Sequence, residues 1–216
     1  MTNSVSLAFV DGDAIFLDLR ADRYVGLNRA LSSVLLRLFT DAGGDEGDEA
    51  LVASLVERGL LPAARSGWKS VLCAAPALPS VSWIDRNPTR NFGSTVRSAL
   101  RISIAERRLR SAPIGAVIEQ FRAQKAVAPA RQPDVAVVDG ILGSYYWSGL
   151  LLQAEGRCLP RSIAMALELL RAGFSCDLVI GVMQRPFKAH CWVQAGDVVL
   201  NGGLDEIRPF TPILVV

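Results

Sequence analysis

The sequence predicts an α+β fold built from two consecutive units. Three short β-rich runs in residues 5–28 precede two helical stretches that end near residue 60, which indicates a small first unit. Four helical stretches then occupy residues 94–172, and the pattern changes after them to the alternation typical of strands. We therefore expect helices packed on an antiparallel sheet in the second unit. The expected bounds are 1–80 for the first unit, 81–93 for a connector and 94–216 for the second unit.

The composition is that of a folded protein without a strong electrostatic preference for any partner. Half of the 216 residues are hydrophobic and 20% are charged, which excludes a disordered chain. The net charge of +2 gives no basis for bulk nucleic-acid binding, and no apolar run approaches the ~20 residues that span a membrane. Four cysteines lack a C-x-x-C spacing, and one histidine is too few for most zinc sites. We expect a cytoplasmic protein with reduced thiols, no metal, no targeting segment, and neither nucleic acid nor membrane as partner.

The first unit is expected to contain three strands followed by two helices. Turn-forming residues separate the strands, which run over residues 6–10, 14–19 and 23–27. Asn28 is suited to cap a helix over residues 29–39, where the large apolar side chains share one face. A second helix over residues 48–58 would end at Gly59.

The second unit is expected to begin after a loosely structured segment. Four prolines between residues 62 and 91 indicate little regular structure there. The helices expected beyond it cover residues 94–110, 113–125, 135–152 and 157–172. The strands expected after them cover residues 176–183, 189–194 and 198–201, and a tight turn joins the last two.

Cys158 stands at the start of a strongly helical run. The first N–H groups of a helix lack internal partners and carry partial positive charge, so a thiol placed there ionises more readily. His190 is the only histidine in the chain and hence the only imidazole that could activate a thiol. Cys191 adjoins His190 on an expected strand, so these two side chains point to opposite faces and cannot easily pair. Cys73 lies in the loose segment and Cys176 opens a strand, which leaves Cys158 as the candidate nucleophile.

A third group would be needed to hold the imidazole, and hairpin geometry offers one. The expected turn places His190 opposite residues 200–202, so Asn201 falls near the ring. Its amide oxygen could accept a hydrogen bond from a ring N–H, as asparagine does in papain-like proteases. Asp197 lies at the turn, roughly 20 Å along the strand, and Asp205 lies beyond the paired segment, so both are weaker candidates. The alternative reading of Asn201 is a turn residue before two glycines.

Three segments of the first unit are similar to a known family. They are Asp18-Leu19-Arg20, Arg23-Tyr24-Val25-Gly26-Leu27-Asn28 and Glu57-Arg58-Gly59-Leu60-Leu61. The unit resembles the winged-helix-like, PqqD-like domains that bind leader peptides of ribosomally made natural products, a fold known from the pyrroloquinoline-quinone chaperone. The resemblance implies that a leader adds a strand beside the third strand and packs against the last helix. The residues that we assign to leader binding on this basis are Arg23, Tyr24, Val25, Gly26, Leu27, Leu51 and Leu55. A generic winged-helix or α+β domain is the alternative.

The second unit has the layout of the papain and transglutaminase-like superfamily, with a cysteine at a helix start before an antiparallel sheet that carries histidine. It resembles more closely the lasso-peptide B proteins, which are transglutaminase-like leader peptidases. The matching segments are Cys158-Leu159-Pro160-Arg161-Ser162, Leu169-Leu170-Arg171-Ala172-Gly173-Phe174, Val179-Ile180-Gly181-Val182, Ala189-His190-Cys191-Trp192-Val193 and the tail Pro209-Phe210-Thr211-Pro212-Ile213. With the first unit, the resemblance covers nearly the whole chain in a fused arrangement.

This resemblance implies a cysteine endopeptidase that cuts the leader from the core of a lasso-peptide precursor with Cys158 and His190. It also implies a partner, an asparagine-synthetase-like cyclase that uses ATP, whereas this chain has no phosphate-binding loop motif and is expected to hold no cofactor. The family usually has Asn-Asp after the hairpin, with the aspartate in its triad, but here Asn201 is followed by Gly202. Either Asn201 takes this role, or Asp197 or Asp205 reaches in, or the site is a cysteine–histidine dyad. The alternatives are a non-catalytic adaptor that delivers the precursor and an acyl-transfer enzyme of the same fold.

Overall fold

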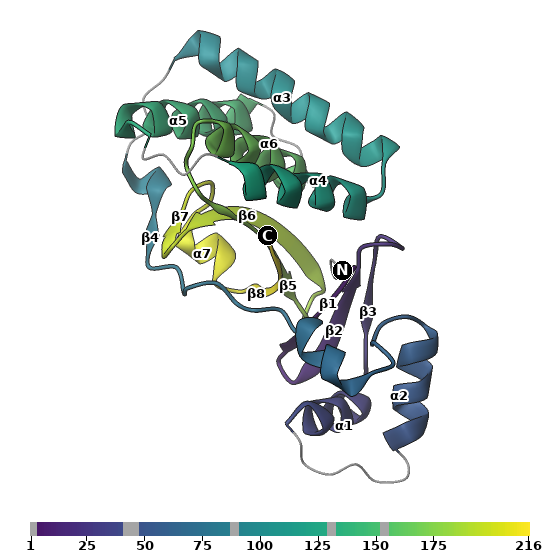
Figure 1. Ribbon diagram of the computed structural model, residues 1–216. Coiled ribbons are helices and arrows are strands. Elements are labelled where there is room, and N and C mark those ends of the chain that lie inside the picture. Colours follow the sequence, from purple (N-terminus) through teal and green to yellow (C-terminus); the bar gives the residue numbers. More distant parts are fainter. Residues whose placement is uncertain (1–3, 41–47, 87–90, 129–132, 152–155) are drawn as a thin grey trace.

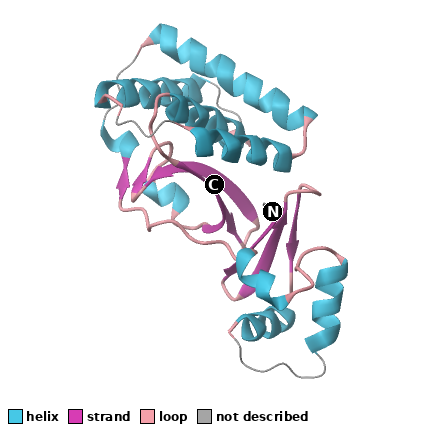
Figure 2. Cartoon of the chain, in the orientation of Figure 1, coloured by secondary structure: helices cyan, strands magenta, loops and turns pink. Residues whose placement is uncertain are grey.

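A computed structural model of the chain describes residues 4–40, 48–86, 91–128, 133–151 and 156–216 (Figure 1). A small sheet lies near the amino terminus, and a larger sheet carries the carboxyl-terminal part of the chain (Figure 2). Four long helices cover one face of the larger sheet (Figure 1). The fold is therefore α+β, with helices packed on a sheet in the second unit, as the sequence predicts.

The first unit contains all five expected elements. They are β1 (Val5–Val10), β2 (Asp13–Asp18), β3 (Arg23–Gly26), α1 (Arg29–Phe39) and α2 (Asp48–Glu57). The strands pair antiparallel in the order β1-β2-β3. Asn28 caps α1 as expected, because its side-chain oxygen accepts the backbone N–H of Leu31 at 3.0 Å. Gly59 follows α2 with a φ of +66°, a left-handed conformation that glycine adopts without strain.

Both faces of the small sheet are buried, which explains why its strands do not alternate cleanly between apolar and polar residues. Leu7 and Phe16 pack with Leu35 in a cluster formed with α1 and α2. Ile15 and Leu17, on the opposite face of β2, belong to the large core of the second unit. The two units therefore share a hydrophobic core, although the expected bounds divide the sequence between them.

The second unit is a five-stranded sheet with helices on both faces. Its helices are α3 (Phe92–Ser111), α4 (Ile114–Val127), α5 (Val135–Leu151), α6 (Cys158–Arg171) and α7 (Leu204–Ile207), and its strands are β4 (Val81–Ser82), β5 (Asp177–Met183), β6 (Lys188–Ala195), β7 (Val198–Val199) and β8 (Thr211–Val215). The strand order is β4-β7-β6-β5-β8, and only the β4–β7 pair is parallel. The long helices lie on the face that α6 contacts, whereas α7 lies on the face that carries Val179 and Trp192. None of the helices in the described segments is long and apolar enough to cross a membrane.

The expected loose connector was wrong for residues 65–70 and 81–86, which form regular elements, whereas residues 73–80 have no regular structure, as expected. Two 3-10 helices, Arg65–Ser70 and Trp83–Arg86, lie on either side of β4. The buried indole of Trp83 donates a hydrogen bond to Asp139 of α5 at 2.7 Å. These residues are ordered because the buried Trp83 ring and the two residues of β4 attach them to the second unit.

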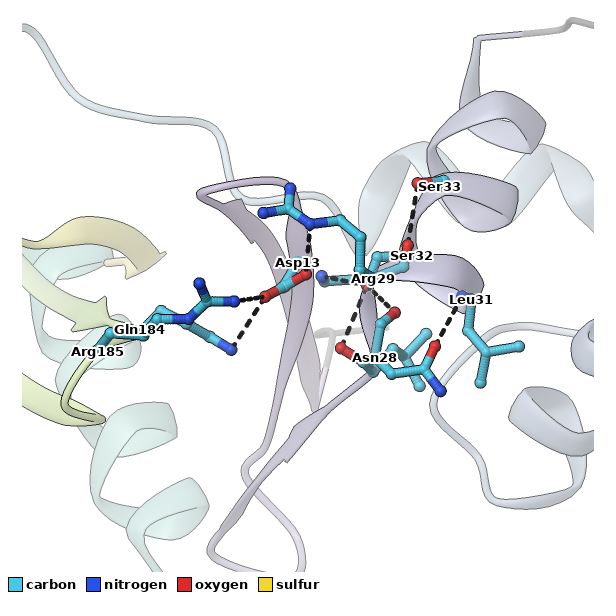
Figure 3. Close-up of polar contacts among 10 residues, drawn as sticks. Asp13, Asn28, Arg29, Leu31, Ser32, Ser33, Gln184 and Arg185 are labelled. Atoms are coloured by element: carbon cyan, nitrogen blue, oxygen red, sulfur yellow. Dashed lines mark hydrogen bonds and ion pairs between the residues drawn. The ribbon is translucent and has the colours of Figure 1, made fainter.

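A buried carboxylate joins the two units. Asp13, at the start of β2, is 3% exposed. Its carboxylate accepts hydrogen bonds from Gln184 at 3.3 Å and Arg185 at 3.2 Å, both in the β5–β6 loop (Figure 3). It also forms an ion pair with Arg29 of α1 at 3.3 Å. The carboxylate is desolvated while the arginines keep contact with water, so these partners stabilise a charge that would otherwise be costly to bury.

Replacing this carboxylate should destabilise the junction between the units. We expect Asp13→Ala to lower the free energy of unfolding by about 1–3 kcal/mol, because three donors lose their shared acceptor. Urea denaturation followed by tryptophan fluorescence measures the difference. Asp205→Ala is the matched control, since it removes an exposed carboxylate and should change stability by less than about 0.5 kcal/mol. Equal stability of the two variants would contradict a structural role for Asp13.

Candidate functional site

The Cys158 thiol lies at the amino end of α6, in agreement with the helix start that the sequence indicates. Gly156 turns the chain toward the helix with a φ of +84°, and Arg157 precedes the first turn without a side-chain capping bond. Pro160 fits in that turn because its missing N–H would have no helical partner there. The thiol is half-buried and free. It therefore lies beside unpaired helix N–H groups and the positive end of the helix dipole.

The other three thiols lie where burial opposes ionisation. Desolvation raises the pKa of Cys73 to about 11 and that of Cys176 to about 12. Cys191 is fully buried, and desolvation raises the pKa of its thiol strongly, with a smaller contribution from Cys158. A thiol whose pKa is raised by burial is a poor nucleophile near neutral pH. The environment of these cysteines thus supports Cys158 as the reactive thiol.

His190 lies on β6 opposite Gly181 of β5. Its ring stacks on Trp192 with centroids 6.2 Å apart and contacts Phe210 at 5.3 Å. A side chain at Gly181 would come within 2.7 Å of the Trp192 ring, so glycine is needed there to leave room for the indole. Cys191 belongs instead to the core on the α6 side, as strand alternation predicts.

Burial lowers the pKa of His190 and favours its neutral form. Two nearby charges modify this effect, because Glu206 raises the pKa and Arg161 lowers it. An imidazole that is neutral near pH 7 can accept a proton from a thiol. The ring therefore has the protonation state that a general base requires.

On the β7 side of β6, side chains complete the hydrogen bonding next to the histidine. Pairing of β6 with β7 ends at Gln194 and Val199, apart from one further backbone bond. Beyond that point the hydroxyl of Ser162, in α6, donates to the Cys191 carbonyl at 2.9 Å. The amide oxygen of Asn201 accepts the next free N–H of β6 at 2.8 Å. The first turns of α6 are thus attached to the stretch of β6 that carries the histidine.

Cys158 and Ser162 are one turn apart and share a face of α6. Because Ser162 contacts the backbone of Cys191, this face brings Cys158 toward the same end of β6. No hydrogen bond joins the Cys158 thiol to the His190 ring within the parts of the chain that the structure describes. Cys158 packs against the core on the α6 side of the sheet, whereas the His190 ring contacts Trp192 and Phe210 of the cluster on the α7 side. The contacts of the described residues therefore bring Cys158 to the strand of His190 but not to its ring.

Asn201 has other partners than the expected imidazole. Its amide oxygen accepts the backbone N–H of Val193 at 2.8 Å, and its amide nitrogen donates to the Ser162 hydroxyl at 2.8 Å. Its carbonyl oxygen accepts a bond from Arg161 at 2.9 Å. This corrects the expectation that Asn201 holds the ring, because both ends of its side chain are used to fasten α6 to β6.

The two aspartates considered as weaker candidates also point elsewhere. Asp197 lies in the β6–β7 turn, where Ser80 donates a hydrogen bond to its carboxylate. The Asp205 side chain is 94% exposed and forms a surface ion pair. The carboxylate whose charge acts on His190 is that of Glu206. No sequence signal marked this residue, because α7 is a single turn and was not expected.

The third strand of the small sheet has a free edge on which another strand could add. Leu27 donates its backbone N–H to Ala14 at 2.9 Å, so alternation directs the N–H and C=O groups of Tyr24 and Gly26 away from β2. Among the described residues, β3 pairs only with β2. Arg23 is half-exposed beside this edge and pairs with Asp18 at 3.7 Å.

Two of the residues assigned to leader binding are core residues. Leu27 is 8% exposed and Leu55 is 1% exposed, and both pack inside the cluster between the small sheet, α1 and α2. Their assignment as ligand contacts was wrong, because the sequence does not show whether an apolar residue faces a ligand or the core, and here both face the core. Val25 and Leu51 are partly buried against the same cluster and retain some exposed surface.

Tyr24 links the small sheet to the candidate nucleophile. Its ring contacts that of Phe187, in the β5–β6 loop, edge to face with centroids 5.3 Å apart. Burial raises the pKa of the Tyr24 phenol to about 12. Smaller contributions in the same direction come from the negative charge of Asp22 and from the Cys191 and Cys158 thiolates. The side chain of this β3 residue therefore lies within electrostatic range of Cys158.

A cavity of about 260 Å³ lies next to the attachment of α6 to β6. Tyr145 and Tyr146 of α5 line it on one side, and Arg161, Asn201 and Glu206 supply polar groups on the other. No group of three possible metal ligands occurs in the described segments. The cavity is thus a polar recess beside the residues that attach α6 to β6.

The comparisons with known proteins identify the second unit. The sequence profile of the transglutaminase-like superfamily matches residues 96–215, which include Cys158, His190 and the sheet that carries the histidine. No curated protein and no solved structure gave a significant match. Because the matched region is more than half of the chain, this protein belongs to the transglutaminase-like superfamily.

Proposed function

We propose that this protein is a cysteine endopeptidase that binds the leader of a lasso-peptide precursor and cleaves the leader from the core. The observation that carries the proposal is the attachment of α6 to the open edge of β6, through the Ser162 bond to Cys191. It brings a thiol at a helix start toward the strand that bears the only histidine of the chain. Superfamily membership supports this chemistry, because cysteine and histidine are its usual catalytic pair.

The residues support a two-step acyl transfer to water. His190 takes the proton of the Cys158 thiol, and the thiolate attacks the carbonyl carbon of the scissile bond. The unpaired N–H groups at the start of α6, including that of Cys158, stabilise the oxyanion that forms. His190 then gives its proton to the leaving amine of the core peptide. Water attacks the thioester, releases the leader carboxylate and restores the thiol.

The free edge of β3 supports the recognition half of the proposal. A leader added there would bond to the outward backbone groups of Tyr24 and Gly26, with Arg23 beside it. Tyr24 lies within electrostatic range of Cys158, so a leader on this edge extends toward the nucleophile. The proposed partner is an asparagine-synthetase-like cyclase, which uses ATP to close a ring onto the amine that cleavage releases. The proposed location is the cytoplasm.

Removing the proposed nucleophile should abolish cleavage. We expect Cys158→Ala to release no leader from the precursor peptide encoded beside this gene, because no other thiol lies at a helix start. Mass spectrometry of the reaction, with and without the cyclase, measures free leader. Cys191→Ala is the matched control, since it removes a neighbouring buried thiol and should keep near-normal cleavage. Cleavage by Cys158→Ala would contradict the nucleophile, and a joined acyl–amine product in place of free leader would indicate acyl transfer.

A pair of substitutions at Gly26 tests leader binding at β3. Gly26→Pro removes an outward N–H and places a ring where the added strand would lie, so we expect leader affinity to fall at least about fivefold. Gly26→Ala keeps the N–H, and its methyl group meets nothing within 4 Å, so affinity should stay near wild type. Fluorescence anisotropy with a labelled leader measures both. Equal affinities for the two variants would place leader binding elsewhere.

A further inference from the structure

The ring of His190 needs a partner for its second nitrogen if it is to serve as the base in the proposed reaction. Such a partner fixes the tautomer and stabilises the imidazolium that forms. Asn201 uses its side chain to bond Val193 and Ser162, and Asp197 and Asp205 have other partners. The residues weighed from the sequence thus leave this position unassigned.

Glu206 belongs to α7, whose Ile207 packs in the same cluster as the two rings that contact His190. Its carboxylate oxygen Oε2 accepts the backbone N–H of Gly203 at 3.3 Å, which folds the side chain back over the start of α7. A Cβ atom built on Gly202 would lie 3.3 Å from the same oxygen. The Glu206 carboxylate therefore occupies the space into which a side chain at residue 202 would project. It also lines the cavity beside Arg161 and Asn201.

The charged groups around the ring single out this carboxylate. The His190 ring contacts the rings of Trp192 and Phe210, which form one cluster with Ile207 of α7, so the ring and α7 share a face of the sheet. Glu206 is the acidic group that raises the pKa of His190, and Arg161 of α6 is the cation that lowers it. The carboxylate thus already favours the imidazolium over the neutral ring.

We propose that Glu206 is the positioning residue for His190, reaching from α7 to accept a hydrogen bond from the ring and supplying the carboxylate that residue 202 lacks. The catalytic meaning of this role rests on the proposed function, whereas the influence of the Glu206 charge on the ring does not. Glu206 is exposed, so its three side-chain torsions can adjust to bring the carboxylate to the ring when substrate covers the site. Gly202 has no left-handed φ, so its position could also carry an aspartate.

The single histidine makes this contact directly measurable. In protein purified without a histidine tag, the His190 ring gives one set of imidazole signals, and their pH titration by NMR reports its pKa without any substrate. We expect Glu206→Gln to lower the pKa of His190, because the charge that raises it is lost. Asp205→Asn removes a neighbouring exposed charge of α7 and should leave the titration unchanged. An unchanged pKa in Glu206→Gln would overturn the proposal.

Moving the carboxylate from residue 206 to residue 202 distinguishes a positioning role of Glu206 from a purely structural one. Glu206→Ala should lower kcat/KM for precursor cleavage at least about tenfold, and the limb of the pH–rate profile set by His190 should move to lower pH. The double variant Glu206→Ala/Gly202→Asp should recover both rate and pKa. The space for it exists, because the other atoms nearest to a Cβ at residue 202 lie at 3.8 and 4.0 Å. Circular dichroism confirms that each variant is folded.

The outcomes distinguish this proposal from the proposed function. Normal cleavage by Glu206→Ala, beside an inactive Cys158→Ala, would overturn the role of Glu206 and leave the peptidase intact. Failure of the wild-type protein to cleave the precursor would overturn the peptidase. The titration of His190 in the same proteins would still decide whether the Glu206 carboxylate acts on the ring.

Discussion

The candidate site depends on one constraint, which is that β6 has strand β7 beside it only at its carboxyl end, so the stretch that carries the histidine lacks a strand on that side. Pairing with β7 stops near Gln194, and the chain after β7 leaves the sheet. The exposed backbone groups of β6 must find other partners, since burying them unpaired would be costly. Ser162 and Asn201 provide those partners. The hydrogen bonds that complete the sheet are thus the same bonds that fix the amino end of α6, and with it Cys158, beside the strand of His190.

The first unit is built into this arrangement at several points. Its small sheet contributes Ile15 and Leu17 to the large core, and Asp13 holds the loop that leads into β6. Tyr24 of the outermost strand contacts Phe187 and packs, like Cys158, against the large core. In the proposed function, a peptide held on β3 would lie on the unit whose contacts with the second unit these residues make. This would let recognition of a leader set the place of cleavage by distance along the peptide.

Local signals in the sequence predicted the features that depend on neighbouring residues. The Asn28 cap, the helix start at Cys158 and the opposite orientations of His190 and Cys191 follow from capping preference and strand periodicity. Features that depend on tertiary packing were missed or misassigned. The burial of Leu55 can be predicted only when the elements packed against α2 are known. The role of Asn201 can be predicted only when Ser162 of α6 is known to lie beside β6. Glu206 could not be foreseen, because a four-residue helix has no periodicity to reveal it.

The central claim is that Cys158 and His190 form a reactive pair, and alkylation of the thiols tests it most directly. Limiting iodoacetamide is added between pH 5 and 9, and peptide mass spectrometry gives the modification rate of each of the four cysteines. The account predicts that Cys158 reacts first near neutral pH, at least about tenfold faster than Cys73 or buried Cys191, and that His190→Ala removes this advantage. Equal reactivity of Cys158 and Cys73, or a Cys158 rate that does not change in His190→Ala, would contradict it.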